Sequence, residues 1–486
     1  MRKSWMNLFG IVGLTLALGC GKQPVRSAAE FKGDTSGRIV GSSSENSPIF
    51  DATASDPDSD APAFDGLTEP TGADSAEPVP KPPQFVIPGQ PDPPTTSKEA
   101  IPRDSRAEET MAAESAISDG ASAISGGTSA ATIRRSGATR EQRGFSPERV
   151  YFATNREPVH SVAAAKDPDL YFGGDCGDVV YGTCEVSIPY RRAPGSLPEP
   201  SILRLEFSQD PEKHVVLMEI ALLPNADFWK QLRAAVDASP DKRLLLFIHG
   251  YSATFRDSAR RTAQMAYDMN YQGPSMFFSW PAGAESESFS EKANYLKDLR
   301  RAEESDEDLI TVLAGISRYS GARRIHLVAH SMGNFVLTEA LKTIDDRRTR
   351  GTIQEPLFDQ VALAAPDLDA KEFVERTGER LLPFSRRFTV YASEHDKALR
   401  LSRAVNGYEP LGFLNEYSRI GAKKRLFDLV DVSQLTTGWF DSGHIYYGDM
   451  PEMISEFDFV FRGVKAASLQ RGLGETPPIF RLSRRN

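Results

Sequence analysis

The stretch between residues 325 and 344 constrains the fold of this chain more than any other. Residues 325–329 are a short apolar run, which is typical of a strand buried on both faces of a sheet. Residues 335–344 carry apolar side chains at a spacing near 3.6, which predicts an amphipathic helix. Only Ala329-His330-Ser331-Met332-Gly333 joins the two, and its first and last residues are small. The sequence therefore predicts a very sharp strand-to-helix turn.

A serine on such a turn has the form of a nucleophile elbow, which exposes the Ser331 hydroxyl at the carboxyl end of a strand. The usual pattern is Gly-x-Ser-x-Gly, and Ala329 at the first glycine adds only a methyl group. The alternative is that Ser331 merely caps the following helix. The strand before it and the helix after it favour the elbow.

Strands and helices alternate on both sides of this turn. We expect strands at 243–248, 276–280, 360–364, 388–391 and 426–430, and helices at 255–269, 306–319 and 453–464. Ahead of them we expect strands with antiparallel or mixed pairing at 150–156, 181–189, 203–207 and 214–223, and a helix at 228–236. Repeated strand–helix units predict an α/β fold with a mostly parallel central sheet and helices on both faces. Ligands of such sheets bind at the carboxyl ends of the strands.

A serine hydroxyl becomes a useful nucleophile only beside a base that an acid orients. In this architecture the chain order is serine, acid, histidine, and only His395 and His444 follow Ser331. His395 directly follows a predicted strand and would be out of order, so we expect His444 to be the base. Asp396, past the strand at 388–391, is our first choice for the acid, and Asp367 is the alternative.

Attack on an acyl group creates an oxyanion that backbone N–H groups must receive. We expect one donor from Met332, directly after the nucleophile. The second is expected from the loop after residues 243–248, where Tyr251 or Ser252 follows His249-Gly250. Glycine at this point lets the backbone approach a substrate closely, whereas His249 itself is expected to be a structural hydrogen-bonding residue.

Four ordered segments resemble a bacterial group of alpha/beta hydrolases long described as a domain of unknown function. They are 247–251 (Phe-Ile-His-Gly-Tyr), 259–264 (Ala-Arg-Arg-Thr-Ala-Gln), 278–281 (Phe-Ser-Trp-Pro) and 326–334 (His-Leu-Val-Ala-His-Ser-Met-Gly-Asn). The resemblance covers roughly residues 149–464. It implies the alpha/beta-hydrolase fold and an esterase- or lipase-like serine hydrolase, with Ser331, His444 and Asp396 as its catalytic residues. It implies no particular substrate.

The N-terminus has the pattern of a secretory signal. Arg2 and Lys3 precede an apolar run at residues 8–18, which is short for a membrane span. Residues 17–20 (Ala-Leu-Gly-Cys) resemble the bacterial lipobox, which implies that Cys20 is lipidated. We therefore expect a signal peptide at 1–20 and a lipid anchor in the bacterial cell envelope, on the outer membrane or the periplasmic face. The alternatives are ordinary secretion with cleavage near Gly19, or an uncleaved anchor.

The remaining chain divides by composition. Residues 21–145 are rich in Ser, Ala, Pro, Gly and acidic residues, which predicts a disordered linker, or alternatively a partner-binding segment. We expect the hydrolase domain at 146–466 and a C-terminal tail at 467–486. The polar, acidic stretch 283–301 is a candidate for part of a rim or lid over the site.

Composition bounds the partners. A net charge of −10 and a pI of about 5.4 argue against nucleic acid. Cys176 and Cys184 lie close in sequence and are expected to form a disulfide, with two separate thiols as the alternative. The sequence suggests no metal or other cofactor, since it holds no clustered Cys/His pattern. The expected partners are a small-molecule or lipid ester and a membrane. A non-catalytic binding module or a structural envelope lipoprotein is the competing function.

Overall fold

The computed structural model describes residues 131–134, 144–283, 290–348, 356–435, 443–464, 472–473 and 479–484. The predicted signal peptide at 1–20, the lipidation site Cys20 and the linker up to residue 130 lie outside the described residues. The folded part begins earlier than the predicted boundary at residue 146, because residues 131–134 and Phe145 already belong to strands.

The described strands are β1 Ala131–Arg134, β2 Phe145–Pro158, β3 Phe172–Pro189, β4 Val216–Leu223, β5 Arg243–Ile248, β6 Ser275–Ser279, β7 Arg324–His330, β8 Gln360–Ala364, β9 Phe388–Ala392, β10 Asp428–Asp431, β11 Gly472–Leu473 and β12 Ile479–Arg481. The described α-helices are α2 Pro168–Tyr171, α3 Asn225–Asp237, α4 Phe255–Asp268, α5 Glu291–Glu303, α6 Asp306–Tyr319, α7 Gly333–Arg347, α8 Ala370–Glu372, α9 Gly378–Leu381, α10 Lys397–Asn406, α11 Glu416–Lys423, α12 Tyr446–Asp449 and α13 Pro451–Phe461. Short 3-10 or π turns lie at Ile202–Arg204, Phe373–Thr377, Leu382–Phe384 and Ser433–Leu435.

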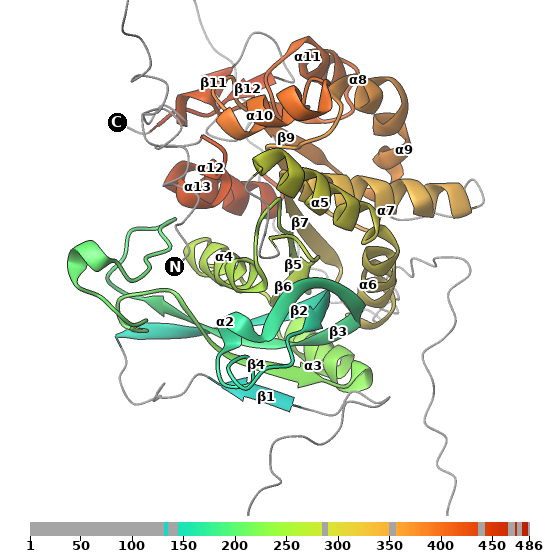
Figure 1. The fold of residues 1–486 in the computed structure, drawn as a ribbon. Helices are drawn as coiled ribbons and strands as arrows, with labels where there is room; N and C mark the ends of the chain where they lie inside the picture. Colours follow the sequence, from blue (N-terminus) through green and yellow to red (C-terminus); the bar gives the residue numbers. More distant parts are fainter. Residues whose placement is uncertain are drawn as a thin grey trace, which may run out of the picture. The chain divides into compact units, whose positions relative to one another are not determined.

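One mixed sheet connects all the described strands in the order β1-β4-β3-β2-β6-β5-β7-β8-β9-β10-β12-β11 (Figure 1). Pairing is parallel from β2 through β12 and antiparallel among β1, β4, β3 and β2 and between β12 and β11. Ile248 at the end of β5 pairs with Ala329 near the end of β7. The loops that follow these two strands therefore leave the sheet side by side.

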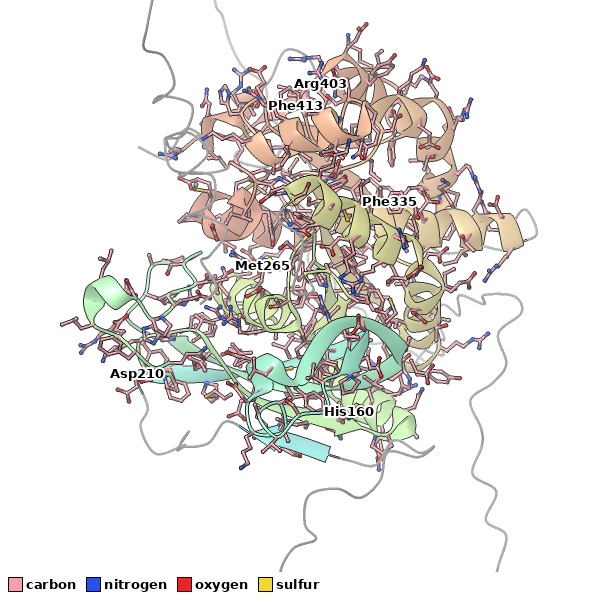
Figure 2. The ribbon with its side chains drawn as sticks, in the orientation of Figure 1. His160, Asp210, Met265, Phe335, Arg403 and Phe413 are labelled. Carbon is pink, nitrogen blue, oxygen red and sulfur yellow. The ribbon has the colours of Figure 1, made fainter. Side chains whose placement is uncertain are left out.

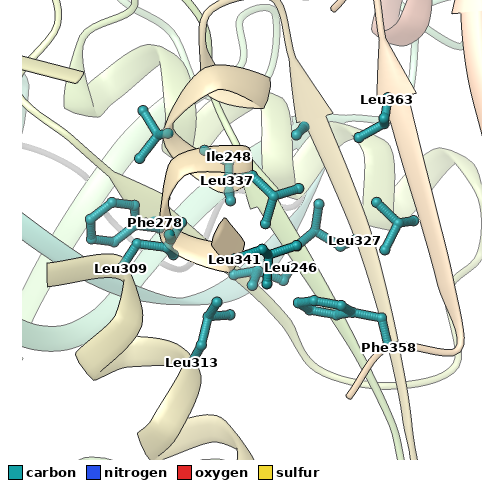
Figure 3. Packing of buried hydrophobic residues seen from close by; sticks show 14 of the residues in the cluster. Leu246, Ile248, Phe278, Leu309, Leu313, Leu327, Leu337, Leu341, Phe358 and Leu363 are labelled. Carbon is teal, nitrogen blue, oxygen red and sulfur yellow. The ribbon is translucent and has the colours of Figure 1, made fainter. Parts of the chain in front are cut away.

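The core lies on both faces of the sheet, because successive residues of a buried strand point to opposite sides. Leu246 and Ile248 of β5 face α6 and α7, whereas Leu245 and Phe247 face the side covered by α4 and α13. Figure 3 shows the first face, where Leu313 and Leu341 close over the strands. This two-sided burial explains why the parallel strands read as continuous apolar runs in the sequence.

Two sequence predictions about the elements were wrong, and one helix was not predicted. Residues 203–207 form no strand: a 3-10 turn at Ile202–Arg204 leads into an exposed loop. The alternation of apolar residues is typical of a strand, but none of the described strands pairs with this segment. The C-terminal tail is not wholly outside the domain, since β12 pairs in parallel with β10. Most of the polar stretch 283–301 forms helix α5, which the sequence pattern did not predict.

The expected disulfide is also wrong. Cys176 and Cys184 are free cysteines, both on β3. Eight residues of extended strand span about 26 Å, whereas a disulfide needs Cα atoms within roughly 7 Å of each other. Cys184 is buried, and the exposed Cys176 donates toward Glu304 over 3.8 Å. None of the helices in the described ranges is long and apolar enough to span a membrane.

Candidate active site

The turn between β7 and α7 holds Ser331 in a left-handed conformation, with φ +52°. This region is unfavourable for residues other than glycine, and such strain persists only where the surroundings fix it. Here the Ser331 amide donates to the Ala364 carbonyl over 3.0 Å. The Asn334 side chain donates to the Ser331 carbonyl, also over 3.0 Å. Both backbone groups of the serine are thus fixed, and the predicted sharp turn is confirmed.

Two glycines let the neighbouring loop lie directly against this turn. A Cβ on Gly333 would stand 2.3 Å from the His249 carbonyl oxygen. A Cβ on Gly250 would stand 2.7 Å from the Ser331 Cβ and 2.9 Å from His330 Nδ1. Real Cβ atoms do not approach other atoms so closely. Glycine at both positions is therefore a requirement of the contact between the loop after β5 and the elbow.

His444 lies beside Asp396, which follows β9. The distance from His444 Nδ1 to Asp396 Oδ2 is 2.8 Å, and both residues are buried. The other carboxylate oxygen of Asp396 accepts the Leu399 amide over 2.9 Å and so caps α10. Burial alone would lower the pKa of His444. The charge and the hydrogen bond of Asp396 outweigh it, so the pKa of His444 is raised above 6.5.

His330 connects His444 to the elbow. Its Nε2–H donates to the His444 carbonyl over 3.1 Å, and the two ring centroids are 4.6 Å apart. Its other neighbour is the Tyr447 ring, stacked at 4.2 Å. Burial holds the pKa of His330 well below 6.5, so the ring is neutral. Because His330 precedes Ser331 directly, this bond brings the loop of His444 next to the serine.

Asp367 lies close to the elbow, but its carboxylate has other partners. It accepts hydrogen bonds from Tyr295 (2.8 Å), Ser402 (2.6 Å) and Tyr408 (3.3 Å). Its own amide donates to the Ser331 carbonyl over 3.3 Å. Burial raises the pKa of the Asp367 carboxyl, and the three hydroxyl donors only partly oppose this effect. Of the two acid candidates, the structure therefore brings Asp396, not Asp367, to the imidazole.

One of the two candidate oxyanion donors in the loop after β5 already binds a carboxylate. The Ser252 amide donates to Asp298 Oδ2 of α5 over 3.0 Å. Ser252 itself has a left-handed backbone, with φ +59°. The same carboxylate accepts the Gly283 amide over 3.1 Å. The carboxylate thus occupies the Ser252 N–H. The other expected donor, Met332, immediately precedes α7.

Arg156 at the end of β2 supports this loop, and the sequence reading missed it. Its guanidinium is buried and donates to Ser279 Oγ (2.8 Å) and to the carbonyls of Ala253 (2.7 Å), Ala282 (2.8 Å) and Gly173 (3.0 Å). It forms no ion pair with the described carboxylates. Burial lowers its pKa to about 9. The arginine that follows the apolar run at 150–153 within the same strand is a signal that could have identified it.

His249 has the structural role that the sequence suggested. Its ring stacks on Trp280 at 5.1 Å, and the Trp280 indole N–H donates to the His249 carbonyl over 2.8 Å. Burial and the nearby Arg156 charge lower its pKa to about 3, so the ring stays neutral.

Two arginines of α4 bind neighbouring segments. Arg260 donates to the Val215 carbonyl over 2.6 Å, and Arg261 donates to the Asp449 carboxylate over 2.7 Å. These contacts hold α4 against its neighbours.

Residues 225–459 match a family described as "Alpha/beta hydrolase of unknown function (DUF900)". No curated protein sequence matches the chain. Among the described residues, no group of three or more His, Cys, Asp or Glu side chains is arranged to hold a metal ion.

Three solved structures are similar at low identity. The esterase Pf2001 of Pyrococcus furiosus has 9% identity and a TM-score of 0.24, over 62% of this chain and 87% of that chain. A fungal esterase of Rhizomucor miehei has 10% identity and a TM-score of 0.27, over 68% of this chain and 85% of its own. Phospholipase PlaB of Legionella pneumophila has 12% identity and a TM-score of 0.19, over 42% of each chain. The protein has the alpha/beta-hydrolase fold, as the sequence predicted.

Proposed function

We propose that the protein is a serine hydrolase that cleaves carboxylic esters, with Ser331 as nucleophile, His444 as general base and acid, and Asp396 as the residue that orients the imidazole. The observation that carries the proposal is the buried 2.8 Å contact between His444 and Asp396. The His330 bond to the His444 backbone supports it, because it joins this pair to the elbow.

In the proposed reaction His444 Nε2 takes the Ser331 proton while the serine oxygen attacks the ester carbonyl. Asp396 accepts the Nδ1–H of His444, which leaves the lone pair of Nε2 facing the serine and stabilises the imidazolium that forms. The amide N–H groups of Met332 and Tyr251 stabilise the oxyanion. The imidazolium then protonates the departing alcohol. Water, deprotonated by His444, releases the acid and restores the serine.

The substrate in this proposal is a small-molecule or lipid ester. We also propose, from the N-terminal sequence alone, that Cys20 carries a lipid anchor and that the protein resides in the bacterial cell envelope. Incorporation of labelled palmitate into the wild type, and its loss in Cys20→Ser, would support this location. Equal incorporation into both proteins would contradict it.

The test of the chemistry is labelling by a fluorophosphonate probe. We expect the wild type to be labelled and Ser331→Ala and His444→Ala to be unlabelled. His395→Ala is the matched control, since this exposed histidine also follows Ser331 and should leave labelling intact. Labelling of Ser331→Ala would contradict Ser331 as the nucleophile. No labelling of the wild type where a control esterase reacts would favour a non-catalytic binding module or a structural lipoprotein instead.

A further inference from the structure

The connection between β3 and β4 presents three large apolar side chains to solvent. Leu203, Leu205 and Phe207 are 97%, 76% and 81% exposed. The connection is the green segment that extends away from the sheet at the left of Figure 1, and Figure 2 labels Asp210 near its end. Single exposed apolar residues are ordinary on protein surfaces, whereas a contiguous group marks a contact site.

The polar residues between them hold the loop in this orientation. The Glu206 carboxylate accepts from Arg204 Nε (2.9 Å), the Ser201 amide (3.1 Å) and His214 Nε2 (3.2 Å). Arg204 also donates to the Glu199 carbonyl over 2.6 Å. Charged groups therefore bind one another at the base of the loop, while the apolar side chains point into solvent. In most surface loops the apolar side chains point inward and the charged ones outward.

The backbone at the tip of the loop is strained, and a hydrogen bond within the loop holds it in this conformation. Leu205 has φ +56°, a conformation that residues other than glycine adopt only at a cost. The Glu206 amide closes the turn by donating to the Ser201 carbonyl over 3.0 Å. Hydrogen bonds within the loop thus fix the exposed conformation, although the apolar side chains gain no burial from it.

The base of the loop is fastened at the edge of the sheet that carries the candidate site. Gln209 donates to Asp169 of α2 over 2.7 Å, and α2 follows the carboxyl end of β2. Arg256 in the first turn of α4 lies 3.5 Å from Glu199 and 3.6 Å from Asp169. Helix α4 begins just after the loop that lies against Ser331. Strands β2 and β5 run parallel, so the segments that follow them, α2 and α4, both begin on the side of the sheet where the strands end. The elbow lies on the same side.

We propose that Leu203, Leu205 and Phe207 insert into the surface of a lipid bilayer, so that the folded domain contacts the membrane independently of any anchor at the N-terminus. The three side chains offer about 500 Å² of apolar surface. A stable protein interface needs roughly 800 Å² from each partner. The tip also projects away from the sheet (Figure 1), a shape that suits insertion between headgroups.

The charges around the tip identify the kind of bilayer. Acidic residues outnumber basic ones between positions 199 and 213. An apolar tip without a basic surround should bind zwitterionic phosphatidylcholine as well as anionic lipid, and salt should weaken the binding little. The inference does not depend on the proposed chemistry, since the hydrogen bonds described above for the tip involve none of Ser331, His444 and Asp396.

The experiment measures co-sedimentation of the full chain with phosphatidylcholine vesicles. All proteins carry Cys20→Ser, so the predicted lipidation contributes to none of them. The test variant replaces Leu203, Leu205 and Phe207 with serine. The matched control replaces three exposed leucines elsewhere, Leu296, Leu382 and Leu401, with serine.

We expect the test variant to lose at least about tenfold in the vesicle partition coefficient, and the control to stay within about twofold of the parent. Equal partitioning of test variant and parent would overturn the proposal. So would binding that requires anionic lipid and disappears in salt. Loss of self-association in the test variant, by sedimentation velocity and without a change in vesicle binding, would instead assign the tip to a second copy of the chain. Probe labelling of Ser331 in solution, which should be unchanged in the test variant, separates this result from failure of the proposed chemistry.

Discussion

Replacing Asp396 with asparagine should separate the role of this carboxylate from its structural contacts. Asparagine has the same shape and caps helices as well as aspartate does, so the bond from the Leu399 amide to the residue at position 396 can persist. What disappears is the negative charge 2.8 Å from His444 Nδ1. The variant should therefore fold, and its defect should be in catalysis.

The magnitude follows from the distance. With an effective dielectric constant of about 20, a carboxylate 3–4 Å from an imidazolium contributes roughly 4–6 kcal/mol. Because each 1.36 kcal/mol changes a rate tenfold, we expect kcat on a p-nitrophenyl ester to fall by roughly 10³- to 10⁴-fold. Asp367→Asn is the matched control, since Asp367 is equally buried near the elbow but binds Tyr295, Ser402 and Tyr408. It should lose less than about tenfold.

The pH dependence of activity is a second, independent test of the role of Asp396. A general base must be neutral, so activity of the wild type rises as pH passes the pKa of His444, which lies above 6.5. In Asp396→Asn the charge that raises this pKa is gone and burial still lowers it, so the acid limb should move to lower pH. The same raised pKa stabilises the folded wild type below pH 6.5, and this stabilisation is lost as pH rises through the folded value. Two results would refute the reasoning: a fall in kcat for Asp367→Asn as large as that for Asp396→Asn, or an unmoved acid limb.

Three further variants test the surroundings of the serine. Gly250→Ala puts a methyl 2.7 Å from the Ser331 Cβ, so kcat should fall by about 100-fold or more; a change below threefold in steady-state kinetics would show that the loop can move away. Ser331→Gly should melt about 2 °C above Ser331→Ala in calorimetry, because only glycine adopts φ +52° without strain; equal melting temperatures would contradict the strain. Arg156→Met leaves four acceptors, two of them fully buried, without their donor and should lower the free energy of unfolding by about 3 kcal/mol or more. Arg156→Lys should recover part of that loss. Denaturant titration of all three proteins measures both effects, and a Met variant as stable as the wild type would contradict the prediction.

The sequence determined the parallel half of the sheet and the elbow. Local physics suffices there, since apolar runs buried on both faces and a 3.6-residue period are readable without partners. The chain order of serine, aspartate and histidine also limited the candidate residues to a few. Those features depend on spacing along the chain, which a sequence contains in full.

The tertiary structure decided what depends on contacts between distant segments. Only the fold distinguishes Asp396 from Asp367, because both follow strands of the same sheet and differ in which side chains surround them. The roles of Asp298 and Arg156 at the loop after β5 follow from contacts across 46 and 97 positions of the chain, which no local pattern contains. The disulfide prediction failed for the same reason: nearness in sequence becomes separation in space when the intervening residues form an extended strand. The apolar residues at 203–207 alternate as they would in a strand, but the segment is a loop that pairs with none of the described strands, and its apolar side chains are exposed.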